Sequence, residues 1–401
     1  MKKDFIKKFF IEDNACTPYK LILNRAHNYL LLNGMEATNC RGEADIIIIG
    51  TCGAFQSMEE ETIRFIEKAK AEKKKDTELI VFGCLPGIHS QRVKSYMPDR
   101  IVHSSNWEQI ELLIDNPLVP LQDVPEANKF RDRKDYRLYD ESKQFVLIQT
   151  GCSSDCPFCP HKMGIGNLKS LPPDNILKQV HYLDKEENVN TICLTGNDTG
   201  SYGTDINTTY PALLKQVLVE SSLQIHISQM NPDWVYKYKN ELWQLLVNRK
   251  VREFQMLIQS VSDRVLEMME RKPVVRSLKE WLRELRKARP DLIFRTDLII
   301  GYPTSTEEEE QESLKYVAEL FDEVAVHGFE RFKQARIEKQ NVPFYASSEV
   351  NLRVEKALAF FRKYPKIIVH RGGQVIKSLE AIEQPKDELR KKNNSVLSCG
   401  A

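Results

Sequence analysis

The chain has 401 residues, of which 41% are hydrophobic and 29% are charged, and its formal net charge is +1. This length exceeds one ordinary core, so we expect two domains or more. Its apolar runs are too short to cross a bilayer and it lacks a signal-peptide pattern, so we expect a cytoplasmic protein without membrane contact. The near-zero charge excludes a globally basic nucleic-acid binder. Nine cysteines in such a compartment indicate metal or redox chemistry rather than disulfides.

Residues 1–120 are predicted to form a small doubly wound α/β domain with a parallel sheet. Residues 44–52 and 77–84 are continuous apolar runs, which are typical of parallel strands buried on both faces. Between them, residues 57–75 have a helical pattern that ends in lysines, and Ser57 is the predicted N-cap. The order strand, helix, strand predicts parallel pairing around one sheet.

A longer α/β domain is predicted at residues 144–344, after a polar, charge-mixed linker at residues 121–143. Strand-like runs lie at residues 144–152, 190–198, 223–231, 252–260, 294–303 and 322–330. Helical patterns lie between them at residues 174–184, 208–220, 263–270, 276–289 and 306–320. Six βα units predict a partial (β/α)6-type barrel, whose active site lies at the carboxyl ends of the strands. Residues 345–401 are predicted to be a short C-terminal extension with a polar tail.

Three cysteines follow the first strand of the predicted barrel, with the spacing Cys152-x3-Cys156-x2-Cys159. His161 offers a fourth ligand, so a structural zinc site is one interpretation. Three clustered thiolates also suit a [4Fe–4S] cluster with one iron left open. The spacing of three and then two residues, with Phe158 just before the last cysteine, is the radical S-adenosylmethionine (SAM) signature. It therefore favours the cluster.

A second set of three cysteines is dispersed along the first domain. Cys16, Cys52 and Cys84 each come just after a predicted strand. Because the carboxyl ends of parallel strands face one crevice, these thiols can converge there. The alternative is that they are small buried hydrophobic residues, as free cysteines often are, and the spacing does not decide between the two. Three further cysteines have no predicted ligand role: Cys40, Cys193 and Cys399.

With both cysteine sets in view, the sequence resembles the radical-SAM methylthiotransferases, which modify tRNA adenosines or a ribosomal-protein aspartate. The resemblance extends over residues 1 to about 340. Residues 190–214 are similar to the family's strand followed by a G-x5-Y-G segment, and are closest to the branch that acts on threonylcarbamoyl-adenosine in tRNA. Residues 257–272 resemble its Q-S-x-S-D-x-V-L-x-x-M-x-R segment. Residues 295–314 resemble its T-D-x-I-x-G-F-P-x-E-T segment.

The chain departs from the family pattern at several places. Ile165 and Gly166 stand where the family commonly has Arg-Gly, and His226 replaces an arginine ahead of an Asn-Pro pair. Residues 331–334 replace the family's R-P-G-T segment. Residues 345–401 are too short for the RNA-binding β-barrel with which members usually end. We therefore expect the substrate to be either a modified tRNA adenosine or a peptide or small molecule.

The resemblance implies two [4Fe–4S] clusters and SAM as cofactors, and a low-potential electron donor such as flavodoxin or ferredoxin as partner. One SAM supplies the methyl group, and another supplies the radical that attacks an unactivated C–H bond. The implied ligands of the radical-SAM cluster are Cys152, Cys156 and Cys159. The implied ligands of the second cluster are Cys16, Cys52 and Cys84.

Contacts to SAM or substrate are predicted from residues at the ends of barrel strands. These residues are Phe158, Thr195, Gly196, Asn197, Gln259, Ser260, Arg295, Asp297, Gly301 and Tyr302. For Thr195–Asn197 and for Gly301–Tyr302, an ordinary turn is the alternative interpretation. For Arg295 and Asp297, the alternative is a structural ion pair.

Two other functions remain open on the sequence. One is a different radical-SAM reaction, in which the N-terminal cluster only relays electrons. The other is a non-catalytic RNA-binding protein with structural metals, against which the near-neutral charge argues.

Overall fold

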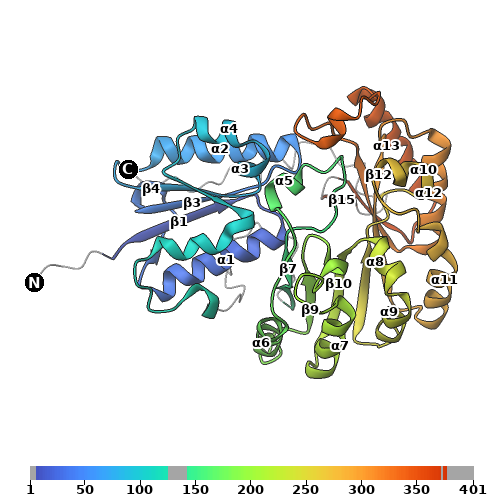
Figure 1. The fold of residues 1–401 in the computed structure, drawn as a ribbon, viewed down its shortest axis with the longest axis horizontal. Coiled ribbons are helices and arrows are strands. Elements are labelled where there is room, and N and C mark those ends of the chain that lie inside the picture. The colour runs from blue at the N-terminus through green and yellow to red at the C-terminus, as the bar shows by residue number, and fades with distance from the viewer. Residues whose placement is uncertain (1–5, 125–141, 372–373, 377–401) are drawn as a thin grey trace, which may run out of the picture.

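A computed structural model describes residues 6–124, 142–371 and 374–376. Two α/β parts lie side by side in it, each built around a largely parallel sheet (Figure 1). Most of the linker predicted at residues 121–143 and most of the predicted tail, with Cys399, fall outside the described residues. The expected class, an N-terminal parallel α/β domain followed by a parallel α/β barrel domain, is confirmed.

The N-terminal sheet has five strands in the order β2-β1-β3-β4-β5, and every pairing in it is parallel. Its strands are β1 (Lys8–Asp13), β2 (Glu36–Ala37), β3 (Ile46–Thr51), β4 (Glu78–Gly83) and β5 (Arg100–His103). Its helices are α1 (Thr17–Leu32), α2 (Gln56–Glu72), α3 (Leu85–Ile88) and α4 (Ser90–Ser95). The strand order reverses between β1 and β3, which makes that point the switch point of a doubly wound fold.

One local prediction in this domain is wrong. Helix α2 begins at Gln56, and its N-cap is Phe55, whose side chain makes no capping hydrogen bond. Ser57 therefore lies inside the first turn.

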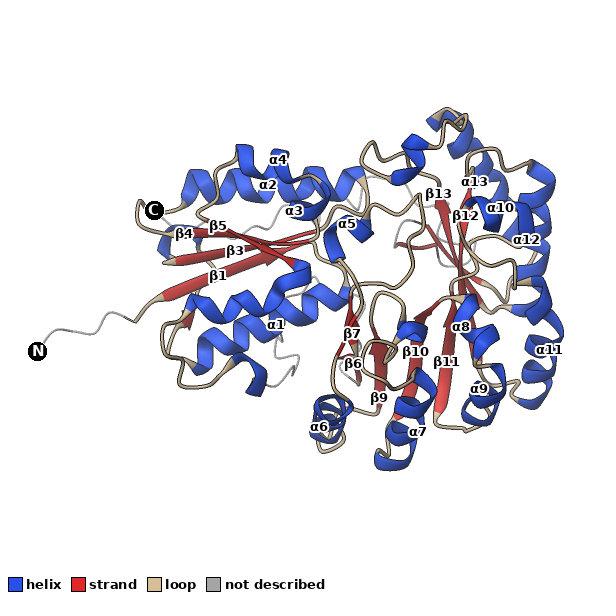
Figure 2. Cartoon of the chain, viewed as in Figure 1, coloured by secondary structure: helices blue, strands red, loops and turns tan. Residues whose placement is uncertain are grey.

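The second sheet has eight strands in the order β15-β14-β13-β12-β11-β10-β9-β6 (Figure 2). Its strands are β6 (Lys143–Leu147), β9 (Thr191–Thr195), β10 (Gln224–Met230), β11 (Val251–Met256), β12 (Ile293–Ile300), β13 (Glu323–Gly328), β14 (Ile368–Arg371) and β15 (Gln374–Ile376). The helices outside it are α6 (Pro173–Leu183), α7 (Tyr210–Glu220), α8 (Pro232–Lys237), α9 (Lys239–Leu246), α10 (Asp263–Met268), α11 (Lys279–Ala288), α12 (Glu307–Leu320) and α13 (Ser347–Phe361). β7 (Gln149–Thr150) and β8 (Lys169–Ser170) form a separate two-stranded ribbon, and helix α5 (His161–Ile165) lies between the two sheets in Figure 2.

The chain beyond residue 344 continues the barrel sheet. Helix α13 packs on β13, and β14 pairs with β13 in parallel register, Glu323 opposite Ile368. The sheet thus runs past the domain boundary expected from the sequence, because the short strand-like piece that follows α13 finds an open edge beside β13.

Short 3-10 turns complete the described elements: Arg41–Glu43, Ser104–Leu113, Leu121–Asp123, Thr199–Ser201, Arg276–Leu278 and Arg336–Lys339.

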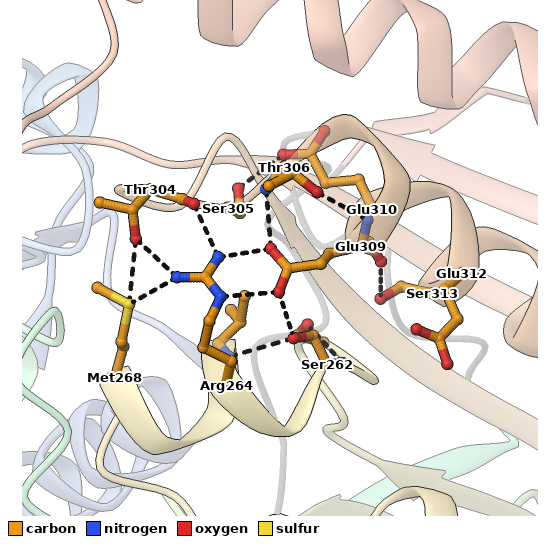
Figure 3. A network of polar contacts seen from close by, with 12 residues as sticks. Ser262, Arg264, Met268, Thr304, Ser305, Thr306, Glu309, Glu310, Glu312 and Ser313 are labelled. Carbon is orange, nitrogen blue, oxygen red and sulfur yellow. Dashed lines mark hydrogen bonds and ion pairs between the residues drawn. The ribbon is translucent and has the colours of Figure 1, made fainter.

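The acidic start of α12 is a capped helix end fixed by an arginine (Figure 3). The Thr306 hydroxyl accepts a hydrogen bond from the Glu309 backbone N–H, and the Glu309 carboxylate accepts one from the Thr306 N–H. Arg264 on α10 donates to both oxygens of the Glu309 carboxylate, over 3.0 and 2.6 Å. These contacts position the turn that follows β12.

Charged side chains fill the barrel interior near the amino ends of the strands. Glu253 on β11 lies 2.7 Å from Arg295, 3.0 Å from the His226 ring and 3.8 Å from the Lys143 ammonium. Arg295 also pairs with Glu323 on β13, over 2.9 Å. Burial opposes the charge of Glu253, but the His226 hydrogen bond and the neighbouring cations lower its pKa to about 2.

We expect this layer to make the barrel sensitive to acid. Because the folded pKa of Glu253 lies below its ordinary value of 4.5, its contribution is complete above about pH 4.5 and is lost as the pH falls toward about 2. The loss is on the order of 3 kcal/mol in the free energy of unfolding. Urea unfolding of Glu253→Gln across this window should show a flatter pH dependence than the natural chain. Glu307→Gln, which alters only an exposed pair with Lys356, should keep the steep dependence.

Candidate functional site

The loop between β7 and α5 carries the first cysteine set. The Cys152 N–H donates to the Gly166 carbonyl over 3.3 Å, and the Lys162 ammonium donates to the Cys152 carbonyl over 2.5 Å. The Cys159 N–H donates to the Cys156 carbonyl over 3.1 Å. The backbone thus folds back on itself and keeps the three sulfurs in one loop. All three are free thiols.

The second set lies at the switch point of the N-terminal sheet. Thr51 and Gly83 are paired residues at the ends of β3 and β4, and Cys52 and Cys84 directly follow them. Cys16 follows β1 and precedes α1. The electrostatic influence of Cys16 and Cys52 contributes to raising the pKa of Cys84, after the larger effect of burial. Because β1, β3 and β4 are neighbouring parallel strands, the three dispersed cysteines lie at the same edge of the sheet.

Both sets offer desolvated thiols to a metal group. Burial raises the pKa of Cys16 and of Cys152 to about 12, and that of Cys159 to about 11. Such thiols stay protonated at neutral pH unless iron displaces the proton, so metal binding would release protons here. Among the described residues, no three His, Cys, Asp or Glu side chains are grouped to hold a single metal ion. Each set offers three thiols that are half-buried or buried, and three thiolates are the donor type of an iron–sulfur cluster with one open iron.

The two sets meet across the contact between the domains. Burial raises the pKa of Cys84 most, Cys16 and Cys52 raise it less, and Cys159 of the other domain adds a smaller contribution. Helix α5 packs on α3, and Figure 1 shows α5 between the two parts. A Cβ at Gly164 would lie 2.6 Å from the Cys84 carbonyl oxygen, and one at Gly87 would lie 2.4 Å from the Met163 carbonyl oxygen. Only glycine permits this approach, which brings the two cysteine loops together.

A cavity of about 440 Å³ opens at the carboxyl ends of the barrel strands, and we call it the reaction cavity. Cys16 and the three cysteines of the first set line it, while Cys52 and Cys84 do not. Further lining residues come from strand ends and loops of both domains, among them Phe55, Asn197, Gln229, Gln259, Asp297 and His327. The Tyr19 hydroxyl donates to the Asn197 side chain over 3.2 Å, which ties the N-terminal domain to this rim.

Four of the predicted cofactor contacts line the reaction cavity: Phe158, Asn197, Gln259 and Asp297. Gln259 is the most telling, because its backbone has φ +62° and its buried side-chain oxygen has no hydrogen-bond partner within the described part of the chain. A strained residue with an unsatisfied acceptor at a cavity is a feature of ligand sites. Asp297 is held by Gln255 over 3.0 Å and by the His327 ring over 3.2 Å.

The other predicted contacts do not line the cavity, and their surroundings are structural. Tyr302 packs edge-on against Phe158, with ring centroids 5.8 Å apart. Gly301 has φ +72° and forms the turn after β12. Arg295 belongs to the ion-pair layer near the amino ends of the strands. Three more are buried or tightly packed at the strand ends: Thr195, Gly196 and Ser260.

Two residues of the cavity were missed by the sequence reasoning. Asp198 is buried, and its carboxylate accepts hydrogen bonds from the Asn231 N–H over 3.2 Å and the Trp234 indole over 2.9 Å. Burial nevertheless raises its pKa to about 6. Burial opposes the charge of Arg271, but Cys156 and Asp198 beside it raise its pKa overall. Arg271 lies in the segment at residues 257–272 that resembles the family, and Asp198 directly follows the predicted contact Asn197. Their nearness in sequence to predicted site residues is the feature that could have identified them.

No helix in the described ranges combines the length and the apolar character needed to span a bilayer.

Family models match both halves of the chain. Residues 146–317 match the Radical SAM superfamily, and residues 8–103 match the uncharacterized protein family UPF0004. The solved structure of the radical SAM methyltransferase TsrM from Kitasatospora setae superposes with a TM-score of 0.60, over 83% of this chain and 77% of that chain, at 11% identity. That likeness concerns the fold.

Curated relatives give the narrower family. A probable threonylcarbamoyladenosine tRNA methylthiotransferase of Pyrococcus horikoshii is 29% identical over 325 residues, which are 78% of this chain and 74% of the relative. The ribosomal protein uS12 methylthiotransferase RimO of Alkaliphilus oremlandii is 30% identical over 315 residues, 75% of this chain and 69% of the relative. The chain belongs to the radical-SAM methylthiotransferase family. It is a sulfur-inserting enzyme whose cofactors are SAM and [4Fe–4S] clusters, and the recognition made from its motifs is confirmed.

Proposed function

We propose that the enzyme inserts a methylthio group at an unactivated C–H bond of a substrate held in the reaction cavity. Cys152, Cys156 and Cys159 hold the radical-SAM cluster in this proposal, and the second cluster is held by the dispersed set. When bound, the two clusters and SAM supply the methyl group, the sulfur and the 5′-deoxyadenosyl radical. The observation that carries the proposal is the close packing of the Cys84 loop on helix α5, together with the cavity that Cys16 and the first cysteine set line in common.

The chain's own side chains can orient SAM beside the first cysteine set. The amino-acid part of SAM carries a carboxylate and an amino group. Arg271 offers a cation next to Cys156, and Asp198 offers a carboxylate near Cys152. Gln259 offers a buried amide oxygen without a partner among the described residues. We assign Arg271 to the carboxylate, because a charge-assisted hydrogen bond in a desolvated site is strong.

The relatives differ in substrate, since one is named for a tRNA nucleoside and another for a ribosomal protein, at nearly the same identity. We propose a modified tRNA adenosine or a peptide as the substrate class. For the partner we propose a low-potential electron donor such as flavodoxin or ferredoxin, acting in the cytoplasm.

The test compares iron and sulfide in the natural chain and in two triple variants after anaerobic reconstitution. The natural chain should bind about eight irons, and Cys16/Cys52/Cys84→Ala should bind about four. Cys152/Cys156/Cys159→Ala should also keep about four, whereas Cys40→Ala should match the natural chain. Reduced protein should then add a methylthio mass to tRNA or peptide pools.

Equal iron content in the natural chain and in the Cys16/Cys52/Cys84→Ala variant would show that these cysteines hold no cluster. The proposed function would then be wrong. Two clusters with SAM cleavage, but products without sulfur, would favour a reaction in which the N-terminal cluster relays electrons.

A further inference from the structure

A second cavity adjoins the reaction cavity. We call it the outer cavity. It measures about 430 Å³ and lies between the loop that follows Cys52, the end of β13 and the first turns of α13. The two cavities share five lining residues, Phe55, His327, Gly328, Phe329 and Glu330. The two cavities therefore lie side by side, with these five residues between them.

A contact between the domains forms the boundary between the two cavities. Phe55 stacks on the His327 ring, with centroids 6.3 Å apart and planes 19° from parallel. The Gln56 N–H donates to the Glu330 carboxylate over 2.7 Å. The loop that bears the second cysteine set is thus fixed to the end of β13, and the outer cavity lies against this contact. Its occupant touches the same loop that borders the site of chemistry.

The cations of the outer cavity are already neutralised. Its lining includes two arginines. Arg331 pairs with Glu338 over 2.6 Å, and Arg371 pairs with Glu355. An RNA backbone would need cations that are free to contact phosphates. The arginines that line this cavity are instead paired, and the Glu330 carboxylate lines it as well, so the charge pattern disfavours a polyanion such as RNA.

Neutral hydrogen-bonding groups and rings make up much of the rest of the lining. Asn351 and Ser347 line the cavity from α13 as exposed side chains, and neither is held by another side chain or backbone group in the described part of the chain. Each offers both a donor and an acceptor, which matches a peptide unit with its one N–H and one C=O. The stacked Phe329 and Phe344 rings, 6.1 Å apart, and Val350 provide apolar wall for side chains.

We propose that the outer cavity is a binding subsite for an extended peptide segment, which flanks the residue whose side chain enters the reaction cavity. The proposal rests on the proposed function, because that function places the reacting group in the reaction cavity. Asn351 and Ser347 bind the backbone of the segment, and the rings contact its apolar side chains. The reaction chemistry uses neither residue.

The test uses the reconstituted enzyme with SAM and two defined libraries, blocked hexapeptides and hexaribonucleotides. Affinity selection followed by mass spectrometry measures what is retained. The natural chain should retain members of the peptide library at least about tenfold above the RNA library. Asn351→Trp fills the outer cavity and should reduce peptide retention about tenfold or more, as expected for the loss of one or two hydrogen bonds with packing. Leu352→Trp, at an exposed neighbour that does not line the cavity, should leave retention unchanged.

The milder variant Asn351→Leu separates hydrogen bonding from simple blockage and should also weaken retention. Preferred retention of RNA, or equal retention of peptides by the natural chain and Asn351→Trp, would overturn the subsite. Formation of 5′-deoxyadenosine without added peptide is measured in parallel and should be the same in all variants. If the natural chain does not cleave SAM, the proposed function fails, while the binding result still decides on the subsite.

Discussion

Gly164→Ala is expected to lower methylthiolation about a hundredfold while SAM cleavage stays within a few-fold of the natural enzyme. The added Cβ would lie 2.6 Å from the Cys84 carbonyl oxygen and 2.8 Å from the Cys84 Cβ. Contacts this short force the two loops apart. Under the proposed function, sulfur transfer depends on the spacing between the two cysteine sets, whereas SAM cleavage needs only the first set. A misplacement of about 1 Å in a reacting geometry costs about a hundredfold in rate.

The readout is the ratio of methylthio product to 5′-deoxyadenosine, measured with iron content as a check on cluster loading. Gly87→Ala should behave in the same way, since its Cβ would meet the Met163 carbonyl oxygen from the other side of the contact. Gly42→Ala is the matched control, because its Cβ would lie an ordinary 3.4 Å from the Glu72 carbonyl oxygen. An unchanged product ratio in both contact variants would mean that the spacing of the two loops does not govern sulfur transfer.

The first cysteine set could be predicted as a cluster site from its spacing, whereas the second set was assigned only through the family resemblance. Cys152, Cys156 and Cys159 lie within one short loop, so their spacing alone indicated a cluster. Cys52 and Cys84 directly follow apolar strands of a parallel sheet. Parallel pairing brings such ends to the same edge, and the register of Thr51 with Gly83 does so here. The sequence did not reveal that the two sets would meet, because that depends on a contact between glycines in separate domains.

The predicted cofactor contacts show where strand-end reasoning becomes ambiguous. Arg295 and Asp297 lie two residues apart on β12, and neither is fully buried. Asp297 reaches the reaction cavity, but Arg295 is one layer nearer the amino end and binds Glu253 and Glu323. A sequence motif does not show how far along the barrel axis each side chain lies. Arg271, in contrast, was not predicted as a contact because it does not end a strand. It follows α10, and the folding of the chain brings it to the reaction cavity.

The outer cavity could not be predicted from the sequence either, because segments far apart along the chain form it. Its walls come from the loop after Cys52, from β13 and from α13, which are separated by almost the whole described chain. The sequence analysis assigned residues 345–401, which include this helix, to a short extension. Parallel pairing of β14 with β13 instead holds α13 against the barrel, where Asn351 and Ser347 face the cavity.

Arg271→Met is expected to weaken SAM binding about ten- to a hundredfold while iron content stays at the natural level. Methionine keeps much of the length and apolar packing of the side chain but removes the cation. A hydrogen bond to a charged group contributes about 1.5–3 kcal/mol, which corresponds to that range of affinity. The measurement is anaerobic equilibrium dialysis of SAM against the reconstituted protein. Arg264→Met is the matched control, because Arg264 binds Glu309 and does not line the reaction cavity.

A second comparison separates the SAM carboxylate from a general effect of charge. Sinefungin retains the amino-acid part of SAM, whereas 5′-deoxyadenosine lacks it. If Arg271 binds the carboxylate, Arg271→Met should lose affinity for sinefungin and keep its affinity for 5′-deoxyadenosine. Equal loss for both compounds would instead assign Arg271 to holding Cys156 and Asp198 in place. Iron loss in the same variant would point to that structural role as well, because Arg271 lies beside the Cys156 thiol.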